Sequence, residues 1–246
     1  MRIALLGRTQ TLLETGKVLR YQGHQIVLVA TGRPSSEDTC SIDDYKSAAD
    51  NWGSEFLERA DVFSLQVLLN QTRPDLSVSS NYPIILPAEI VDIPPYGILN
   101  AHGGDLPRYR GNACQAWAIL QGEPYVALCV HRMIGDEVDS GDIIVREKLT
   151  LTEATKIAEI IEWMTSIIPN CFVEAVRALE KNREYCLERQ SADPAKSLRC
   201  FPRRPEDGRI RWDLKPIEIV RLVNASGPPY TDRCGYETSA QVATEV

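Results

Sequence analysis

Three polar residue types stand where strands are expected to end, and together they could transfer a proton. Asn100 and His102 lie two residues apart at the end of an apolar stretch that predicts a strand over 97–102. Their side chains point to the same face of an extended chain. A second apolar stretch, 126–133, leads into the acid-rich turn 135–142. A histidine can accept a proton near neutral pH, an aspartate can orient it, and an asparagine amide can donate to an oxyanion.

The order of the expected elements places these residues at one edge of a sheet. The sequence predicts a strand over 2–6, a helix over 12–19 and a second strand over 24–31. Strand, helix and strand in this order open a doubly wound parallel sheet. Such sheets bind ligands beyond the carboxyl ends of their strands. We therefore expect an α/β fold with a doubly wound, Rossmann-like and mostly parallel sheet, followed by a small C-terminal appendage.

The remaining periodic segments complete this architecture. They predict helices over 43–52, 61–70, 113–121 and 217–223, strands over 76–79 and 143–149, and a long amphipathic helix over 152–181. Pro169 must kink or split that long helix, because proline lacks a backbone N–H. A polar connector over 192–197 divides the chain into a catalytic domain, 1–190, and a small helical and β subdomain, 198–246.

Charge and composition narrow the class of protein. The net charge is −7 and the pI is about 5.1, which disfavours nucleic acid as the main partner. The seven cysteines are scattered and form no C-x-x-C, so we expect reduced thiols in the cytoplasm. The chain has no membrane-length apolar run, so we expect no membrane partner. The acids of the turn 135–142 do not follow EF-hand spacing, and we expect no metal.

The turn after the first strand could hold an anion. It reads G-R-T-Q rather than G-x-G-x-x-G, so it lacks the dinucleotide fingerprint. Arg8, Thr9 and Gln10 nevertheless lie between a strand end and a helix N-terminus, where backbone N–H groups bind anions. A plain solvated turn remains the alternative.

Several motifs in a fixed order resemble the superfamily of formyltransferases that use 10-formyltetrahydrofolate. The chain carries N-x-H, then L-P-x-Y-R-G, then H-x-M followed by D-S-G-D-I. With the later stretch RRPEDGRIRW, the resemblance covers about residues 1 to 230. It implies that Asn100, His102 and Asp139 are catalytic, Asp139 being the aspartate two residues before the glycine of the motif. His131, by contrast, is expected to be a core histidine.

The resemblance also implies where the two substrates bind. The residues implied for the pterin of the folate co-substrate are Ile84, Ile85, Leu86, Gly135, Asp136 and Val138, although core packing alone would explain the apolar step from 84 to 86. Those implied for the amine substrate are Arg8, Thr9, Gln10, Tyr82, Tyr109, Arg110 and Asn112. Gly103, Gly104 and Asp105 are a mild departure from the family pattern, and Asp105 receives no role.

The branch of the superfamily is inferred from the C-terminal part. Members that act on methionyl-tRNA add a basic barrel after this point, whereas sugar N-formyltransferases share P-E-D-G-x-I-x-W and lack it. The resemblance therefore favours transfer to a 4-amino-4,6-dideoxy sugar linked to dTDP or GDP, by a homodimer. The base, the sugar stereochemistry and a 3-amino acceptor stay open. Three alternatives also remain: a methionyl-tRNA formyltransferase-like activity, a formyltetrahydrofolate hydrolase, and a non-catalytic nucleotide-sugar binder.

Overall fold

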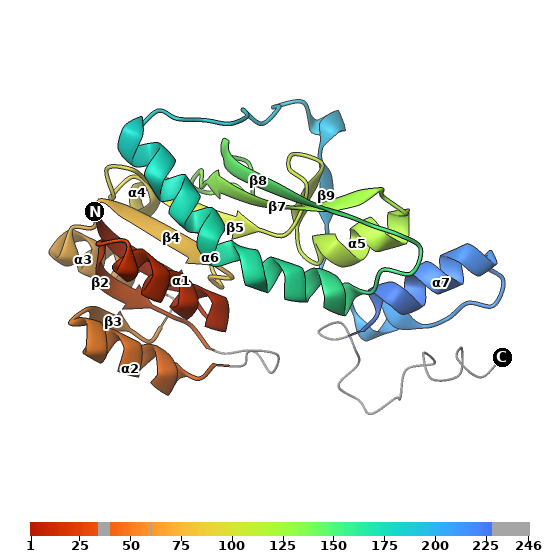
Figure 1. Ribbon diagram of the computed structural model, residues 1–246, viewed down its shortest axis with the longest axis horizontal. Coiled ribbons are helices and arrows are strands. Elements are labelled where there is room, and N and C mark those ends of the chain that lie inside the picture. The colour runs from red at the N-terminus through yellow and green to blue at the C-terminus, as the bar shows by residue number, and fades with distance from the viewer. Residues whose placement is uncertain (34–39, 60, 228–246) are drawn as a thin grey trace. The chain divides into compact units, whose positions relative to one another are not determined.

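The computed structural model describes residues 1–33, 40–59 and 61–227 (Figure 1). The chain forms two compact units that alternate along the sequence. The first contains Met1–His102, Cys129–Arg146 and Thr165–Ala192, and the second contains Gly103–Leu128, Glu147–Met164 and the chain from Asp193. Among the described residues, no helix is both long and apolar enough to cross a membrane.

The central sheet has seven strands in the order β3-β2-β1-β4-β5-β7-β8. Their bounds are β1 Arg2–Gly7, β2 Gln25–Ala30, β3 Glu55–Leu57, β4 Leu76–Ser80, β5 Ile98–His102, β7 Tyr125–Arg132 and β8 Ile143–Thr150. The pairings of β3 with β2, β2 with β1, β1 with β4 and β4 with β5 are parallel, whereas β5 and β7 are antiparallel. The expected α/β class and mostly parallel sheet are confirmed.

The strand order reverses beside β1. Successive strands are added on one side as β2 and β3, and on the other as β4 and β5. In open α/β sheets this switch point forms a crevice at the carboxyl ends of the strands. Gly7 at the end of β1 is paired with Ser80 at the end of β4, so the segments that follow both strands leave the sheet at the same edge.

The helices of the first unit begin and end at recognisable residues. They are α1 Gln10–Tyr21, α2 Ile42–Trp52, α3 Val62–Thr72, α4 Ala88–Val91 and the C-terminal part of α6 Ile157–Lys181. Ser41 caps α2 and Asp61 caps α3, each by accepting a backbone N–H. α6 continues through Pro169 as one element, so the helix is not split there. It begins later than expected because residues 152–155 form a turn closed by the Thr155 hydroxyl.

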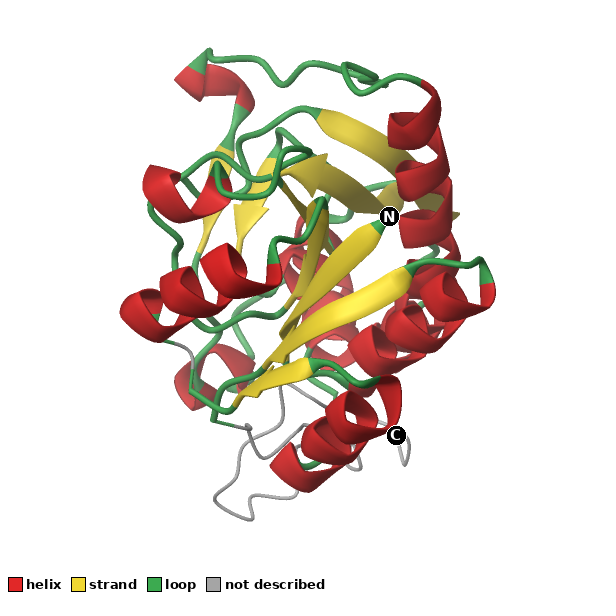
Figure 2. Cartoon of the chain, turned by 90° about the vertical axis from the view of Figure 1, so that its left-hand side faces the viewer, coloured by secondary structure: helices red, strands yellow, loops and turns green. Residues whose placement is uncertain are grey.

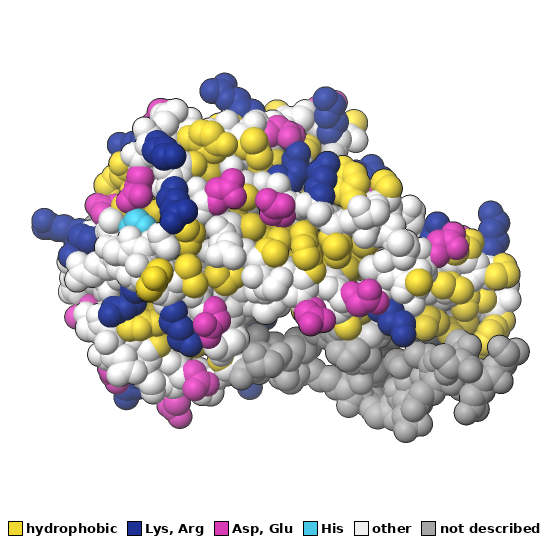
Figure 3. Space-filling model, in the orientation of Figure 1, with side chains coloured by type: hydrophobic (Ala, Val, Ile, Leu, Met, Phe, Trp, Pro, Cys, Tyr) yellow, Lys and Arg dark blue, Asp and Glu magenta, His cyan; other side chains and the backbone are white. Residues whose placement is uncertain are grey.

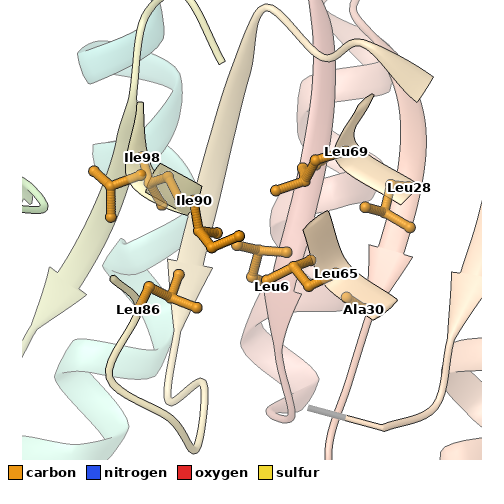
Figure 4. Close-up of a cluster of buried hydrophobic side chains, with 10 residues drawn as sticks. Leu6, Leu28, Ala30, Leu65, Leu69, Leu86, Ile90 and Ile98 are labelled. Atoms are coloured by element: carbon orange, nitrogen blue, oxygen red, sulfur yellow. The ribbon is translucent and has the colours of Figure 1, made fainter. Parts of the chain in front are cut away.

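Apolar side chains cover both faces of the parallel strands. On one face, Leu65 and Leu69 of α3 pack with Leu6, Leu28 and Ile98 of the sheet (Figure 4). On the other face, α1 approaches so closely that a Cβ on Gly16 would lie 2.7 Å from Leu5 Cδ1. Figure 2 shows the strands with helices on both sides. This packing fixes the strand ends, because the buried strands cannot shift without exposing their apolar residues.

The second unit contains a small parallel ribbon and two helices. β6 Tyr109–Gly111 pairs with β9 Leu198–Cys200. α5 spans Cys114–Gln121, α7 spans Pro216–Ala225, and short 3-10 helices span Pro194–Lys196 and Pro205–Gly208. Apolar side chains gather on the surface around α7 (Figure 3).

Candidate active site

β5 and β7 place Asn100 beside His131. Asn100 pairs with Ser79 of β4 on one side and with His131 of β7 on the other. His102 is the last residue of β5 and is buried, with 7% of its surface exposed. The two residues thus stand at the end of a central strand, as their spacing predicts.

The turn after β7 brings Asp139 back to this strand end. Asp139 has a φ of 52°, in the left-handed region that aspartate tolerates better than most residues. Gln190 Nε2 donates to the Asp139 carbonyl at 2.9 Å and to the Gly141 carbonyl at 2.7 Å. A Cβ on Gly141 would lie 1.9 Å from the Arg132 carbonyl oxygen, so only glycine fits there. The turn is therefore held by contacts on both sides of Asp139.

The Asp139 carboxylate joins Asn100 and His102. Its Oδ2 lies 3.3 Å from His102 Nδ1, and its Oδ1 lies 3.5 Å from Asn100 Nδ2. With Nδ1–H directed at the carboxylate, His102 presents Nε2 as its basic nitrogen. The contact to Asn100 is at the limit of a hydrogen bond, so an amide N–H can turn from Asp139 to a developing oxyanion at little cost.

His131 is the fourth member of this cluster, and sequence reasoning treated it only as a core residue. It is 1% exposed. Its Nδ1 lies 2.8 Å from the Arg132 carbonyl oxygen. Because a carbonyl only accepts, Nδ1 carries a hydrogen. Nε2 of the same ring lies 3.3 Å from Asn100 Nδ2 and 3.4 Å from Asp139 Oδ1. His131 therefore contacts both Asn100 and Asp139.

Gln190 is a second residue that sequence reasoning missed. It lies far along the chain from the turn that it holds and belongs to no motif we recognised in the sequence. For His131 a signal existed, because it is the first residue of the H-x-M motif. The structure shows that it is buried and that it contacts Asn100 and Asp139.

The segments expected to hold the pterin are neighbours in the structure. Asp136 N donates to the Leu86 carbonyl at 2.9 Å, and a Cβ on Gly135 would lie 2.2 Å from Ala88 Cα. Leu86 and Ile84 pack on the core, whereas Ile85 is 60% exposed. Val138 is half-buried in the same turn. Core packing thus accounts for Ile84 and Leu86, and pterin contacts by this segment remain a prediction.

The segment after β1 leaves the sheet at the edge where β4 and β5 also end. Arg8 Nη1 donates to the Arg33 carbonyl at 3.4 Å, and the Thr9 carbonyl accepts from the Tyr45 hydroxyl at 2.8 Å. Gln10 is exposed and bonds to Glu14 within α1. Tyr82, after β4, is half-buried, and burial raises the pKa of its hydroxyl. An amine-substrate role for these residues remains a prediction.

The loop that carries Tyr109, Arg110 and Asn112 belongs to the second unit. The Tyr109 hydroxyl donates to Glu123 Oε1 at 2.6 Å, and burial raises its pKa. Arg110 is half-buried on β6, and Asn112 N donates to the Cys200 carbonyl at 3.0 Å. Asp105, to which sequence reasoning gave no role, accepts from the Tyr125 hydroxyl at 2.9 Å. The Tyr109 hydroxyl therefore supports the loop, its ring is buried in the same unit, and an amine-substrate role for these residues remains a prediction.

The cluster is suited to the transfer of a group at a carbonyl carbon. A histidine held by a carboxylate can accept a proton from an attacking nucleophile, and the neighbouring amide can stabilise the oxyanion. In the part of the chain that the structure describes, no set of three or more His, Cys, Asp or Glu residues could hold a metal ion. The doubly wound fold and this site define a group-transfer enzyme.

A comparison with known protein families identifies the class of group-transfer enzyme. Residues 1–176 match the formyl transferase family, and the chain belongs to that family.

Relatives of two kinds are similar to the chain. The methionyl-tRNA formyltransferase of Prochlorococcus marinus strain MIT 9515 is 27% identical over 240 residues, which cover 93% of this chain and 72% of the relative. A sugar N-formyltransferase from Shewanella sp. FDAARGOS_354 has a similar fold, with a TM-score of 0.65, 15% identity and coverage of 92% of this chain and 87% of the other. The N-formyltransferase from Helicobacter canadensis was solved with folinic acid and dTDP-3-aminofucose. Its TM-score is 0.67 at 14% identity, and the match covers 92% of this chain and 80% of the other.

Proposed function

We propose that this protein transfers the formyl group of 10-formyltetrahydrofolate to the amino group of a nucleotide-linked aminodeoxy sugar. The observation that carries the chemistry is the contact of Asp139 with both His102 and Asn100, at 3.3 and 3.5 Å. Sugar N-formyltransferases of similar fold cover 92% of this chain. These structural neighbours support the sugar branch, although their coverage matches the 93% of the methionyl-tRNA relative.

The proposed reaction proceeds through a tetrahedral intermediate. The neutral sugar amine attacks the formyl carbon, and a new C–N bond forms as the carbonyl electrons move to oxygen. Asn100 donates to that oxyanion. His102 Nε2 accepts the amine proton, and Asp139 stabilises the resulting imidazolium. Collapse of the intermediate breaks the bond between carbon and N10, and the proton returns to N10 of the leaving tetrahydrofolate.

The proposed acceptor is a sugar with an amino group at C4 or C3. The expectation from the sequence is a 4-amino-4,6-dideoxy sugar linked to dTDP or GDP. The ligand of the Helicobacter canadensis relative is dTDP-3-aminofucose, so the 3-amino position belongs in the same test. Arg8 and Arg110 each remain a substrate contact predicted from the sequence, because a guanidinium pairs well with phosphate oxygens.

Methionyl-tRNA is the second candidate acceptor. It is favoured by the identity of 27% over 240 residues to the Prochlorococcus marinus relative. The net charge of −7 counts against it, because binding of tRNA phosphates requires a basic surface.

A panel of acceptors tests the proposal. The purified protein is incubated with 10-formyltetrahydrofolate and, separately, with dTDP-, GDP- and UDP-linked 4-amino and 3-amino sugars, with methionyl-tRNA, and with no acceptor. Tetrahydrofolate release and the mass of the formylated product are measured. We expect an N-formyl sugar from at least one nucleotide sugar. Formylation of methionyl-tRNA alone would contradict the sugar proposal, and formate release without an acceptor would indicate a hydrolase.

A further inference from the structure

Two of the described cysteines lie together outside the catalytic cluster. None of the six described cysteines forms a disulfide. Cys114, the first residue of α5, and Cys200, the last residue of β9, belong to one buried cluster with Tyr109 in the second unit. Their exposed fractions are 2% and 6%. Two buried thiols thus lie in one small cluster.

Backbone contacts place both cysteines next to the end of β6. Gly111 of β6 pairs with Cys200 of β9, and Asn112 N donates to the Cys200 carbonyl at 3.0 Å. From the side of α5, Cys114 Sγ lies 3.5 Å from the Gly111 carbonyl oxygen. The Cys114 and Cys200 side chains pack in the same buried cluster. Trp117 Nε1 donates to the Phe201 carbonyl at 3.0 Å and anchors the end of β9 to α5.

We propose that Cys114 and Cys200 are a redox-active dithiol, which a low-molecular-weight disulfide converts into an intramolecular disulfide. The Cys200 thiolate attacks one sulfur of the reagent disulfide, forming a mixed disulfide and releasing one reagent thiolate. The Cys114 thiolate then attacks the Cys200 sulfur and releases the second reagent thiolate. The two protein thiols are oxidised, the reagent disulfide is reduced, and the two S–H protons pass to the reagent thiols.

Cys200 is the attacking residue for two reasons. The neighbouring Cys114 side chain lowers the pKa of the Cys200 thiol, an effect that burial opposes. Cys200 also ends a strand of only three residues that pairs with β6 in a two-stranded sheet, next to Phe201, which is 67% exposed. We expect this short strand to open transiently, which gives the reagent access. Cys114, in the same buried cluster, is the residue that resolves the mixed disulfide.

The disulfide would fasten β9 beside the loop that carries Arg110. Arg110 of β6 pairs with Arg199 of β9, the residue before Cys200. The crosslink would therefore lie in the same two-stranded ribbon as Arg110. The chemistry of the dithiol does not depend on the identity of the amine acceptor, and its test needs no substrate.

Oxidised glutathione and peptide mapping test the proposal on the full chain. The reduced protein is incubated with oxidised glutathione below its unfolding transition, remaining thiols are alkylated, and the peptides are identified by mass spectrometry without reduction. We expect a linked pair of peptides containing Cys114 and Cys200 as the main product, reversed by dithiothreitol. The crosslink closes a long loop, so the unfolding temperature should rise by about 5 °C or more.

Single variants separate the two roles. In Cys114→Ser the mixed disulfide should persist as glutathione on Cys200, because the resolving thiol is absent. In Cys200→Ser, Cys114 should stay unmodified. Cys171→Ala, which alters a buried cysteine of α6, should leave the linkage intact and serves as the matched control. Full alkylation of both thiols in oxidised wild-type protein would overturn the proposal, as would linkage spread equally over other cysteines. The wild-type peptide map decides this even where a variant fails to fold.

Discussion

His102 is the residue on which the proposed chemistry depends most. Its Nδ1 faces Asp139 at 3.3 Å, so a proton accepted at Nε2 is stabilised by a carboxylate on the far side of the ring. His102→Ala should lower kcat by about 10² to 10⁴ while circular dichroism shows an intact fold. His24→Gln, which alters a histidine beside the N-terminal amine, should keep wild-type turnover as the control. Near-wild-type activity of His102→Ala would exclude it as the general base.

Asp139 should act on the rate rather than on substrate binding. Its carboxylate contacts His102, His131 and Asn100, so Asp139→Asn should lower kcat with little change in the KM for the amine. Steady-state kinetics at saturating folate measure both constants. A variant that kept kcat and lost affinity would mean that Asp139 is a substrate contact.

The positions of Asn100 and His102 could be predicted from the sequence, whereas their contacts with Asp139 could not. Asn100 and His102 could be placed because alternation along a strand puts both on one face, and the strand end positions them. Their contact with Asp139 depends on the left-handed φ of that residue and on Gln190, neither of which follows from spacing. His131 was predicted to be a core residue. A histidine in an apolar strand gives the same sequence pattern whether it is only buried or also contacts the site.

The turn that carries Asp139 is the element most sensitive to a small change. A Cβ on Gly141 would lie 1.9 Å from the Arg132 carbonyl oxygen. Gly141→Ala should therefore displace the turn, lower kcat and reduce the free energy of unfolding by about 1–3 kcal/mol. Gly208→Ala, where the nearest atom lies at 3.7 Å, is the matched control. Unchanged kinetics and chemical denaturation of Gly141→Ala would contradict the fixed position of the turn.

The loop around β6 should depend on the Tyr109 hydroxyl for stability. This hydroxyl and the Arg108 guanidinium both donate to Glu123. Tyr109→Phe leaves that carboxylate with one donor fewer and should cost about 1–3 kcal/mol in urea denaturation. Since the ring is retained, the KM for the amine should change less than about twofold. A large rise in KM with unchanged stability would assign the hydroxyl to the substrate instead.

Elements with a local signal could be predicted, and those that depend on distant partners could not. The strands β1, β2, β4 and β5 and the helix α2 follow from apolar runs and capping residues near them in the sequence. The short ribbon of β6 and β9 is formed by residues about ninety apart and has no local signal. α4 is one turn between prolines, where breakers outweigh periodicity.

At the scale of the whole molecule, we propose a homodimer whose copies contact through the second unit. Phe201 and Trp212 are 67% and 76% exposed, and Val220 of α7 is 45% exposed. Apolar side chains gather on the surface around α7 (Figure 3), and contiguous apolar patches mark contact surfaces. Light scattering at micromolar concentration should give twice the chain mass of 27.5 kDa, and Trp212→Arg should shift the mass toward a monomer. A wild-type mass near 27.5 kDa would rule out the dimer.

The most direct test of the central claim is a single-turnover measurement of formyl transfer to a nucleotide-linked amino sugar. Enzyme in excess is mixed with 10-formyltetrahydrofolate and the acceptor, and the N-formyl sugar is followed by mass spectrometry for wild type and for Asn100→Ala. We predict stoichiometric product from wild type and a rate lower by about 10² to 10³ for the variant, because one oxyanion donor is lost. Equal rates for the two proteins, or no N-formyl sugar from any acceptor that binds, would contradict the account.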